Sequence, residues 1–355
     1  MFKFYTFLFC FLFFAKASAD SNCELFTKSQ NIQEIFNLIS LSKSSGVAPL
    51  GFKVHTQKLV FFDQKNYPLC FVLYHQDKLH TFPLKKIAEI ENGIYNFRDK
   101  DNLLSPTDEK QVSLPLRKLG IEKFLIYNFD SNGIDSFSGE ESTTRYHFSF
   151  IIHEGYHLLK QRGVVLNNWD FDQPYFDWSY SQGREFVSSN CYTFNEKVQR
   201  SFQSEQKALV EGYRSIVIGG NKNGAFASLK KFIKIRSDRY NTLAPVKLTH
   251  PSWKSAGNCQ GAEAYLEHLE GGAEYVEISY LLKLGLIKPA DIISSHYLSH
   301  YSTKSAYYVT GMLQLLLAPY LISDFGALER AMMKPNENQD QLPYKLLLRY
   351  FNNLI

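Results

Sequence analysis

The chain has 355 residues, a formal net charge of +4 at neutral pH and 45% hydrophobic residues, enough to bury a large core in one or two domains. Basic and acidic residues are nearly balanced, which gives no sign of the concentrated basic face that nucleic-acid binding usually requires, so we expect no nucleic-acid partner. The most apolar later segment, 312–322, is short and contains Gln314 and Pro319, so it predicts a buried helix rather than a membrane span.

The first 19 residues have the features of a secretory signal peptide. Lys3 precedes an aromatic-rich apolar run over residues 4–15, and the small residues at 17–19 fit a cleavage site. We therefore expect a mature chain that starts near Asp20, is secreted or periplasmic, and has no stable membrane insertion. Cleavage of the signal peptide removes two lysines, so the mature chain has 37 basic and 35 acidic residues.

Four cysteines remain in the mature chain: Cys23, Cys70, Cys191 and Cys259. In an exported protein an even number of cysteines permits two disulfides, and the close spacing of a zinc knuckle is absent. We expect both disulfides to form. The favoured bridge joins Cys191 to Cys259, because these cysteines flank two long irregular stretches, 167–186 and 243–260.

Taken in chain order, helical spacing of apolar residues first predicts a helix over 30–43. Short aromatic and β-branched runs then predict hairpins of an antiparallel sheet at 58–64, 69–76, 79–84 and 93–99, and a further strand is expected at 123–129. From about residue 146 the pattern is mostly helical, with helices expected at 204–220, 225–240, 261–285 and 305–321. The predicted fold class is α+β, with a β-rich region at 20–130 and a mainly helical region at 131–355.

The stretch FIIHEGYHLLKQ, residues 150–161, carries two histidines one helical turn apart. Each residue of a helix turns about 100°, so His153 and His157 share a face and can bind one ion. Glu154 lies beside that face, where a base for a metal-bound water is needed. The other side carries residues that can pack into a core: Phe148, Ile151, Ile152, Gly155 and Leu159. The pattern predicts one zinc per chain, and an ordinary amphipathic helix is the alternative.

A catalytic zinc site needs three protein ligands and an open position for water. The run EHLEGGAEYVE, residues 267–277, places Glu270 and Glu274 on one helical face, so one can bind zinc while the other orients a ligand histidine. Alternative ligands lie on the expected helix at 204–220 and beside Glu270, namely Glu205, Glu211, Glu267 and His268. The paired glycines that follow Glu270 are costly inside a helix and indicate close packing there.

HEGYH followed by a helical E-G-G-A-E-Y resembles the gluzincin-type HExxH zinc metallopeptidases, in which a glutamate on a downstream helix is the third ligand. The resemblance covers these two motifs. It implies a zincin-like fold for the helical region at 131–355, with His153, His157 and Glu270 as zinc ligands and Glu154 as general base. The gap of 113 residues from His157 to Glu270 is longer than in the best-known members, and an inserted helical segment would account for it.

A hydrogen-bond donor beside the metal usually helps to stabilise the oxyanion formed in amide hydrolysis. Tyr308, three residues before Gly311, resembles tyrosines on late helices of some zincin-like proteins, although packing is the default role in a chain with 22 tyrosines. The sequence thus predicts an exported zinc-dependent hydrolase, most consistent with a peptidase that acts on peptides or proteins. The alternatives are a hydrolase of esters or non-peptide amides, and a non-catalytic secreted binding protein with a structural or degenerate zinc site.

Overall fold

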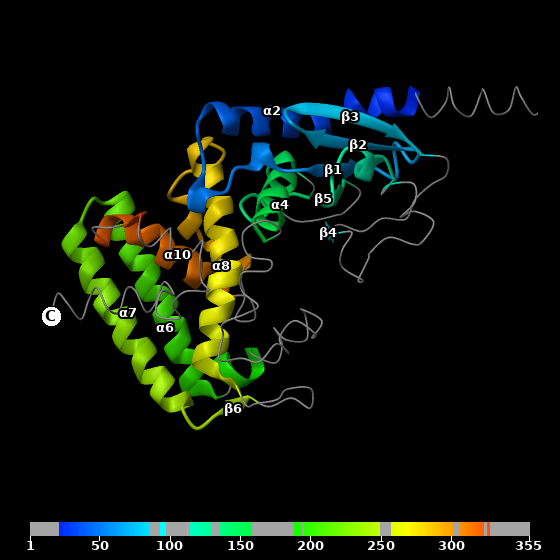
Figure 1. The fold of residues 1–355 in the computed structure, drawn as a ribbon. Coiled ribbons are helices and arrows are strands. Elements are labelled where there is room, and N and C mark those ends of the chain that lie inside the picture. Colours follow the sequence, from blue (N-terminus) through cyan, green and yellow to red (C-terminus); the bar gives the residue numbers. More distant parts are fainter. Residues whose placement is uncertain are drawn as a thin grey trace, which may run out of the picture. The chain divides into compact units, whose positions relative to one another are not determined.

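The computed structural model describes residues 21–84, 93–96, 112, 114–129, 135–141, 143–157, 188–193, 195–248, 257–300, 306–322 and 325–326. The expected signal peptide at 1–19 and the irregular stretch at 167–186 lie outside these ranges. Helices and strands both occur, which confirms a mixed α+β chain (Figure 1). The chain divides into two compact units: the first holds the described residues up to 157 except 49–52 and 136–138, and the second holds those two segments and the described residues from 188 onward.

The first unit contains a five-stranded sheet in the order β3-β2-β1-β5-β4. Its strands are β1 (Leu59–Phe62), β2 (Cys70–His75), β3 (Lys78–Pro83), β4 (Gly93–Asn96) and β5 (Lys123–Asn128). Each lies within a predicted run, except that β3 begins one residue earlier than its run. Three pairs are antiparallel, but β1 and β5 are parallel, with Leu59 opposite Leu125. The antiparallel pairing expected of the first runs is seen between β1 and β2 and between β2 and β3, whereas the parallel pairing of β1 with β5 was not predicted. The long connection from β1 to β5, which contains the other three strands, makes the parallel pairing possible.

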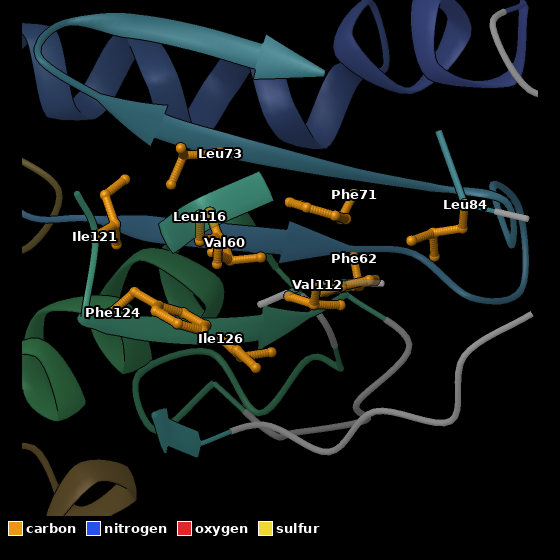
Figure 2. Packing of buried hydrophobic residues seen from close by; sticks show 10 residues of the cluster. All are labelled: Val60, Phe62, Phe71, Leu73, Leu84, Val112, Leu116, Ile121, Phe124 and Ile126. Atoms are coloured by element: carbon orange, nitrogen blue, oxygen red, sulfur yellow. The ribbon is translucent and has the colours of Figure 1, made fainter. Parts of the chain in front are cut away.

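One face of the sheet packs on a cluster of apolar side chains, to which residues 112–121 contribute from outside the strands. Figure 2 shows its members: Val60, Phe62, Phe71, Leu73, Leu84, Val112, Leu116, Ile121, Phe124 and Ile126. The alternate residues of β1, β2 and β5 are buried as well, so these strands are covered on both faces. Burial on both faces explains why their sequences are nearly continuous apolar runs without polar alternation.

Two helices of the first unit, α2 (Gln30–Ser44) and α4 (Thr144–Tyr156), contact the residues on the other face of the sheet. The ring of Phe36 in α2 lies edge-on to that of Tyr74 in β2, with centroids 5.9 Å apart. In α4, Nδ1 of His147 lies 2.5 Å from the hydroxyl of Tyr127 in β5. The helix expected at 30–43 is confirmed as α2, and a further single turn, η2, spans Val54–Thr56.

The second unit is built mainly from helices. They are α6 (Glu196–Tyr213), α7 (Lys222–Leu243), α8 (Cys259–Lys283), α9 (Ser295–His300) and α10 (Ala306–Leu321), with the shorter turns η1 (Pro49–Gly51), η4 (Ser188–Tyr192), η5 (Arg214–Ile218) and η6 (Asp291–Ile293), and the paired strands β6 (Lys247–Leu248) and β7 (Gly257–Asn258). Within the described ranges, no helix combines the length and the apolar character needed to cross a bilayer.

The helix predicted to start at 204 begins earlier, at Glu196. Asn195 caps it, because its Oδ1 accepts a hydrogen bond from the backbone N–H of Val198 at 2.8 Å. The helical path continues through η5 and ends, as expected, at the paired glycines Gly219 and Gly220. Gly220 has a φ of +64°, a left-handed conformation that favours glycine and lets the chain turn back into α7.

Helices α8 and α10 approach each other closely at two glycines. A Cβ atom added to Gly271 would lie 2.5 Å from the Cα of Gly311, and one added to Gly311 would lie 2.5 Å from the carbonyl oxygen of Glu267. A larger residue at either position would therefore push the two backbones apart. This contact confirms the close packing that the glycine pair of α8 predicted.

Two disulfides restrain the chain, and both were expected. Cys23 is bonded to Cys70, which joins the helical residues 21–27 to β2 in the first unit. Cys191 is bonded to Cys259, which joins η4 to the first residue of α8 in the second unit. The favoured pairing is thus confirmed.

Candidate metal site

The HEGYH motif occupies the C-terminal end of α4, and the N-terminus of that helix is firmly anchored. Thr143 caps the helix by accepting a hydrogen bond from the N–H of Tyr146 at 3.1 Å. The buried carboxylate of Asp135 accepts hydrogen bonds from Thr143 Oγ1 at 2.6 Å and from Arg145 Nε at 2.7 Å. His157, the C-cap residue, keeps helical backbone angles, so the two histidines of the motif retain their spacing of one turn.

The face of α4 away from the motif packs into the core of the first unit, as the sequence predicts. Phe148, Ile151 and Ile152 are fully buried, and Gly155 is buried beside them. Leu159, the remaining residue of that predicted face, lies outside the described residues. Because this face is fixed by packing, the helix cannot rotate freely and the direction of its histidines is set.

His153, Glu154 and His157 lie together at the end of α4. One potential ligand atom from each side chain lies within 4.8 Å of the others. The two imidazole centroids are 4.8 Å apart, with their planes at 73°. Two nitrogen ligands of one zinc, each about 2.0–2.1 Å from it, lie up to about 4 Å apart, so small side-chain rotations suffice for both to bind. The group could hold a metal ion; two imidazoles and a carboxylate suit zinc, and imidazole also suits copper, iron and nickel.

Helix α8 carries five glutamates on a single stripe, which we call the acidic stripe. Its members are Glu263, Glu267, Glu270, Glu274 and Glu277. At about 100° per residue, all five fall within an arc of about 80° around the helix. None is more than 7% exposed. The second unit therefore buries an unusual density of carboxylates. The partners of each carboxylate determine whether it is available to bind a metal ion.

Two arginines of α7 bind the N-terminal half of the acidic stripe. Arg236 donates to both oxygens of Glu267, at 2.8 and 2.7 Å, and Arg239 donates to both oxygens of Glu263, at 2.8 and 2.6 Å. Both arginines also bind Glu205 of α6, Arg236 at 2.9 Å and Arg239 at 2.5 Å. Burial alone would raise the pKa of Glu263, but the charges of Arg239 and Arg236 outweigh it and hold that pKa below its ordinary value.

These contacts bear directly on the alternative zinc ligands. Glu205 is fully buried between the two arginines, so a zinc ion there would have to compete with two guanidinium groups. Glu267 binds Arg236 and also accepts a hydrogen bond from Gln314 at 2.9 Å. Glu211 is partly exposed and lies 3.6 Å from the ammonium of Lys231. All three carboxylates are therefore already engaged by other side chains of the second unit.

The alternative ligand His268 lies on α8 between Glu267 and Leu269. It is only 1% exposed, and burial lowers its pKa to about 4. The imidazole is therefore neutral at pH 7, the form that a metal ligand requires. Glu270 and Glu274 are still preferred over His268, because they lie one helical turn apart on the acidic stripe.

The C-terminal half of the acidic stripe contains Glu270 and Glu274, both only 1% exposed. Glu274 Oε1 accepts a hydrogen bond from the hydroxyl of Tyr297 at 2.5 Å. Glu270 and Glu274 thus share a buried helical face, as predicted. They belong to the second unit and the HEGYH motif to the first, so Glu270 as the third ligand stays a prediction.

Tyr308, the predicted oxyanion donor, lies in the first turn of α10. Its ring stacks on that of Tyr307 with centroids 5.1 Å apart, and it packs, partly buried, against the cluster that surrounds the Cys191–Cys259 disulfide. Gly311, the other residue of the Y-x-x-G run, has its own structural role in the contact with α8. Tyr308 therefore has a packing role, and its catalytic role stays a prediction.

Arg236, Arg239 and Tyr297 were not predicted from the sequence, because charged residues and tyrosines on helices most often face solvent or fill space. A usable signal was present for the arginines. They are three apart and lie on the same helical face as Phe232 and Tyr240, so they belong to the buried side of α7.

Comparisons of the chain with protein-family models, with curated proteins and with solved structures found no match.

Proposed function

We propose that the protein is an exported zinc-dependent hydrolase of gluzincin-like type, most consistent with a peptidase. The observation that carries the proposal is the cluster of His153, Glu154 and His157, whose ligand atoms lie within 4.8 Å at the end of a helix that is capped and packed into a core. Two disulfides are compatible with export, because disulfides persist mainly in oxidising compartments.

Each residue of the proposed site has a distinct role. His153 and His157 would hold the zinc, and Glu270 would complete the ligand set. When bound, zinc polarises a scissile carbonyl and lowers the pKa of water. Glu154 accepts the proton of the attacking water and passes it to the leaving amine. Tyr308 donates a hydrogen bond to the oxyanion.

The contacts inside the second unit favour α8 over α6 as the source of the third ligand. Glu205 of α6 is bound by Arg236 and Arg239, whereas Glu270 lies in the part of the acidic stripe beyond the two glutamates that these arginines bind. The two arginines supply two positive charges to three buried carboxylates, those of Glu205, Glu263 and Glu267. A zinc ion ligated by Glu270 would add positive charge to this stripe, and buried carboxylates are stabilised by such charge.

The proposal is tested by hydrolysis of a mixed peptide library by the purified mature protein. Cleavage should stop when zinc is removed with a chelator and return when zinc is added back. The same samples can be offered ester and non-peptide amide substrates, which identifies the bond that is cleaved. Hydrolysis that survives complete zinc removal, or a zinc-loaded protein that cleaves no substrate of any class, would contradict the proposal, and the latter result would favour a binding protein.

A further inference from the structure

Tyr297 is a fully buried residue of α9 that reaches the acidic stripe of α8. After α8 the chain turns at Gly285, where φ is +71°, and returns through η6 to α9. The hydroxyl of Ser294 accepts a hydrogen bond from the backbone N–H of Tyr297 at 3.1 Å, which fixes the start of α9. This return path places a tyrosine 23 residues further along the chain beside Glu274.

The side chain of Tyr297 is held on several sides within the second unit. Its ring stacks on that of Phe137, with centroids 4.7 Å apart and planes only 13° from parallel. Its hydroxyl donates to Glu274 Oε1 at 2.5 Å and lies 3.4 Å from the sulfur of Met312 in α10. The ring therefore cannot swing away, and the hydroxyl has a fixed position.

A hydrogen bond from a phenol to a carboxylate is charge-assisted, and such bonds are short and strong. One fixed donor on Oε1 sets the plane of the Glu274 carboxylate and with it the direction in which Oε2 points. Glu274 follows Glu270 by one helical turn on the same buried face. In metal sites a carboxylate of this kind either binds the metal or orients a ligand histidine, and both roles depend on its direction.

We infer that Tyr297 is a positioning residue for the proposed zinc site: its hydroxyl holds the Glu274 carboxylate in the orientation that the site needs. The inference rests on the proposed function, because it requires zinc at the end of α4 and a contribution from the C-terminal half of the acidic stripe. It goes beyond that function by assigning a role to a residue that neither the HEGYH motif nor the E-G-G-A-E-Y run contains.

The test compares the zinc affinity of Tyr297→Phe with that of the wild-type protein, measured by competition with a chelator of known affinity. The substitution removes one oxygen and keeps the stacked ring. Zinc affinity should fall by about 10-fold to 100-fold, the usual effect of losing a residue that supports a metal ligand. The visible absorption of the cobalt-substituted protein should also change, because it reports the coordination geometry.

Tyr280→Phe is the matched control. Tyr280 is also fully buried, and its hydroxyl donates to a backbone oxygen, that of Phe52, at 3.0 Å. This variant loses a buried hydrogen bond of similar kind and should keep the zinc affinity and the cobalt spectrum of the wild type. Equal weakening of zinc binding in both variants would mean that Tyr297 acts only through general stability, and would overturn the inference.

A double-mutant cycle separates a direct effect on Glu274 from any other. In a Glu274→Gln background, Tyr297→Phe should produce little further loss of zinc affinity, because the charged acceptor is already absent. Wild-type zinc affinity retained in Tyr297→Phe, or a full additional loss in the double variant, would overturn the inference while the proposed function stands. Failure of the wild-type protein to bind zinc at all would instead refute the proposed function itself.

Discussion

Arg239 of α7 and Glu205 of α6 form an ion pair in which Nε lies 2.5 Å from Oε1 and neither side chain is exposed. Arg239 also binds Glu263 of α8, so one guanidinium group joins three helices. A buried ion pair of this kind adds little net stability compared with apolar packing, but its loss leaves the remaining charge buried without compensation. The pair is therefore a point at which the second unit is vulnerable to single substitutions.

Arg239→Met should lower the free energy of unfolding by about 3–5 kcal/mol, because Glu205 and Glu263 would lose a shared partner in a buried environment. Urea denaturation of the mature protein measures the change. Arg200→Met is the control, since Arg200 and its partner Glu196 are largely exposed and such pairs contribute little. Similar losses in the two variants would contradict this view of the buried pair.

The sequence was sufficient to predict the helices and strands that bury an apolar face. Strands β1 and β5 have uninterrupted apolar runs, and helices α2 and α8 have helical spacing of apolar residues. Each of these elements was predicted within a few residues of its observed bounds. The parallel pairing of β1 with β5 could not be predicted, because apolar runs that are buried on both faces carry no signal of strand direction. The start of α6 was missed because its first turns are largely polar, although Asn195 marks the cap.

At the candidate site, the spacing of His153, Glu154 and His157 was sufficient to predict that the three side chains lie together. One helical turn brings them together whatever the rest of the fold. The arginine contacts of Glu205 and the hydroxyl that holds Glu274 come from segments far away in the chain. No local sequence pattern connects these residues, because their pairing depends on how the helices pack together in the folded protein.

Gly271→Ala should destabilise the protein by about 1–3 kcal/mol, because the added methyl group would meet the backbone of Gly311 at 2.5 Å. Gly212→Ala is the control within another helix. There the nearest atom would be 3.5 Å away, an ordinary contact, and the better helix propensity of alanine should leave stability equal or improved. Thermal denaturation of both variants measures the contrast, and a stable Gly271→Ala protein would refute the close contact of α8 with α10.

The four mature cysteines should all be oxidised in the exported protein, so titration of the unfolded, unreduced protein should find no free thiol. Replacing Cys191 and Cys259 together by serine should lower the free energy of unfolding by about 4 kcal/mol, since the bridge closes a loop of 68 residues. Free thiols in the titration would contradict full pairing. A much smaller loss in the double variant would show that the loop is restrained mainly by its other contacts.

Glu154→Gln keeps the shape of the side chain and removes its basicity. If Glu154 is the general base, hydrolysis should slow by about 10²-fold to 10⁴-fold, while the zinc content and the melting temperature stay close to those of the wild type. Activity measured on zinc-loaded protein tests this directly. Loss of zinc from this variant would make Glu154 a ligand or a structural residue instead of a base.

Glu270→Gln is the comparison for Glu154→Gln, because it makes the same chemical change at the proposed third ligand. Zinc should be bound more weakly, and the stability that zinc adds should fall together with activity. Full zinc content and activity in Glu270→Gln would exclude Glu270, and the third ligand would then have to be sought elsewhere.

Zinc analysis of the purified mature protein tests the central claim most directly, together with His153→Ala and with His80→Ala, which removes a histidine of β3 outside the motif. We predict about one zinc per chain in the wild type and in His80→Ala, and a loss of bound zinc in His153→Ala. A wild-type protein that contains no zinc, and whose melting temperature does not change when zinc is added, would contradict the account.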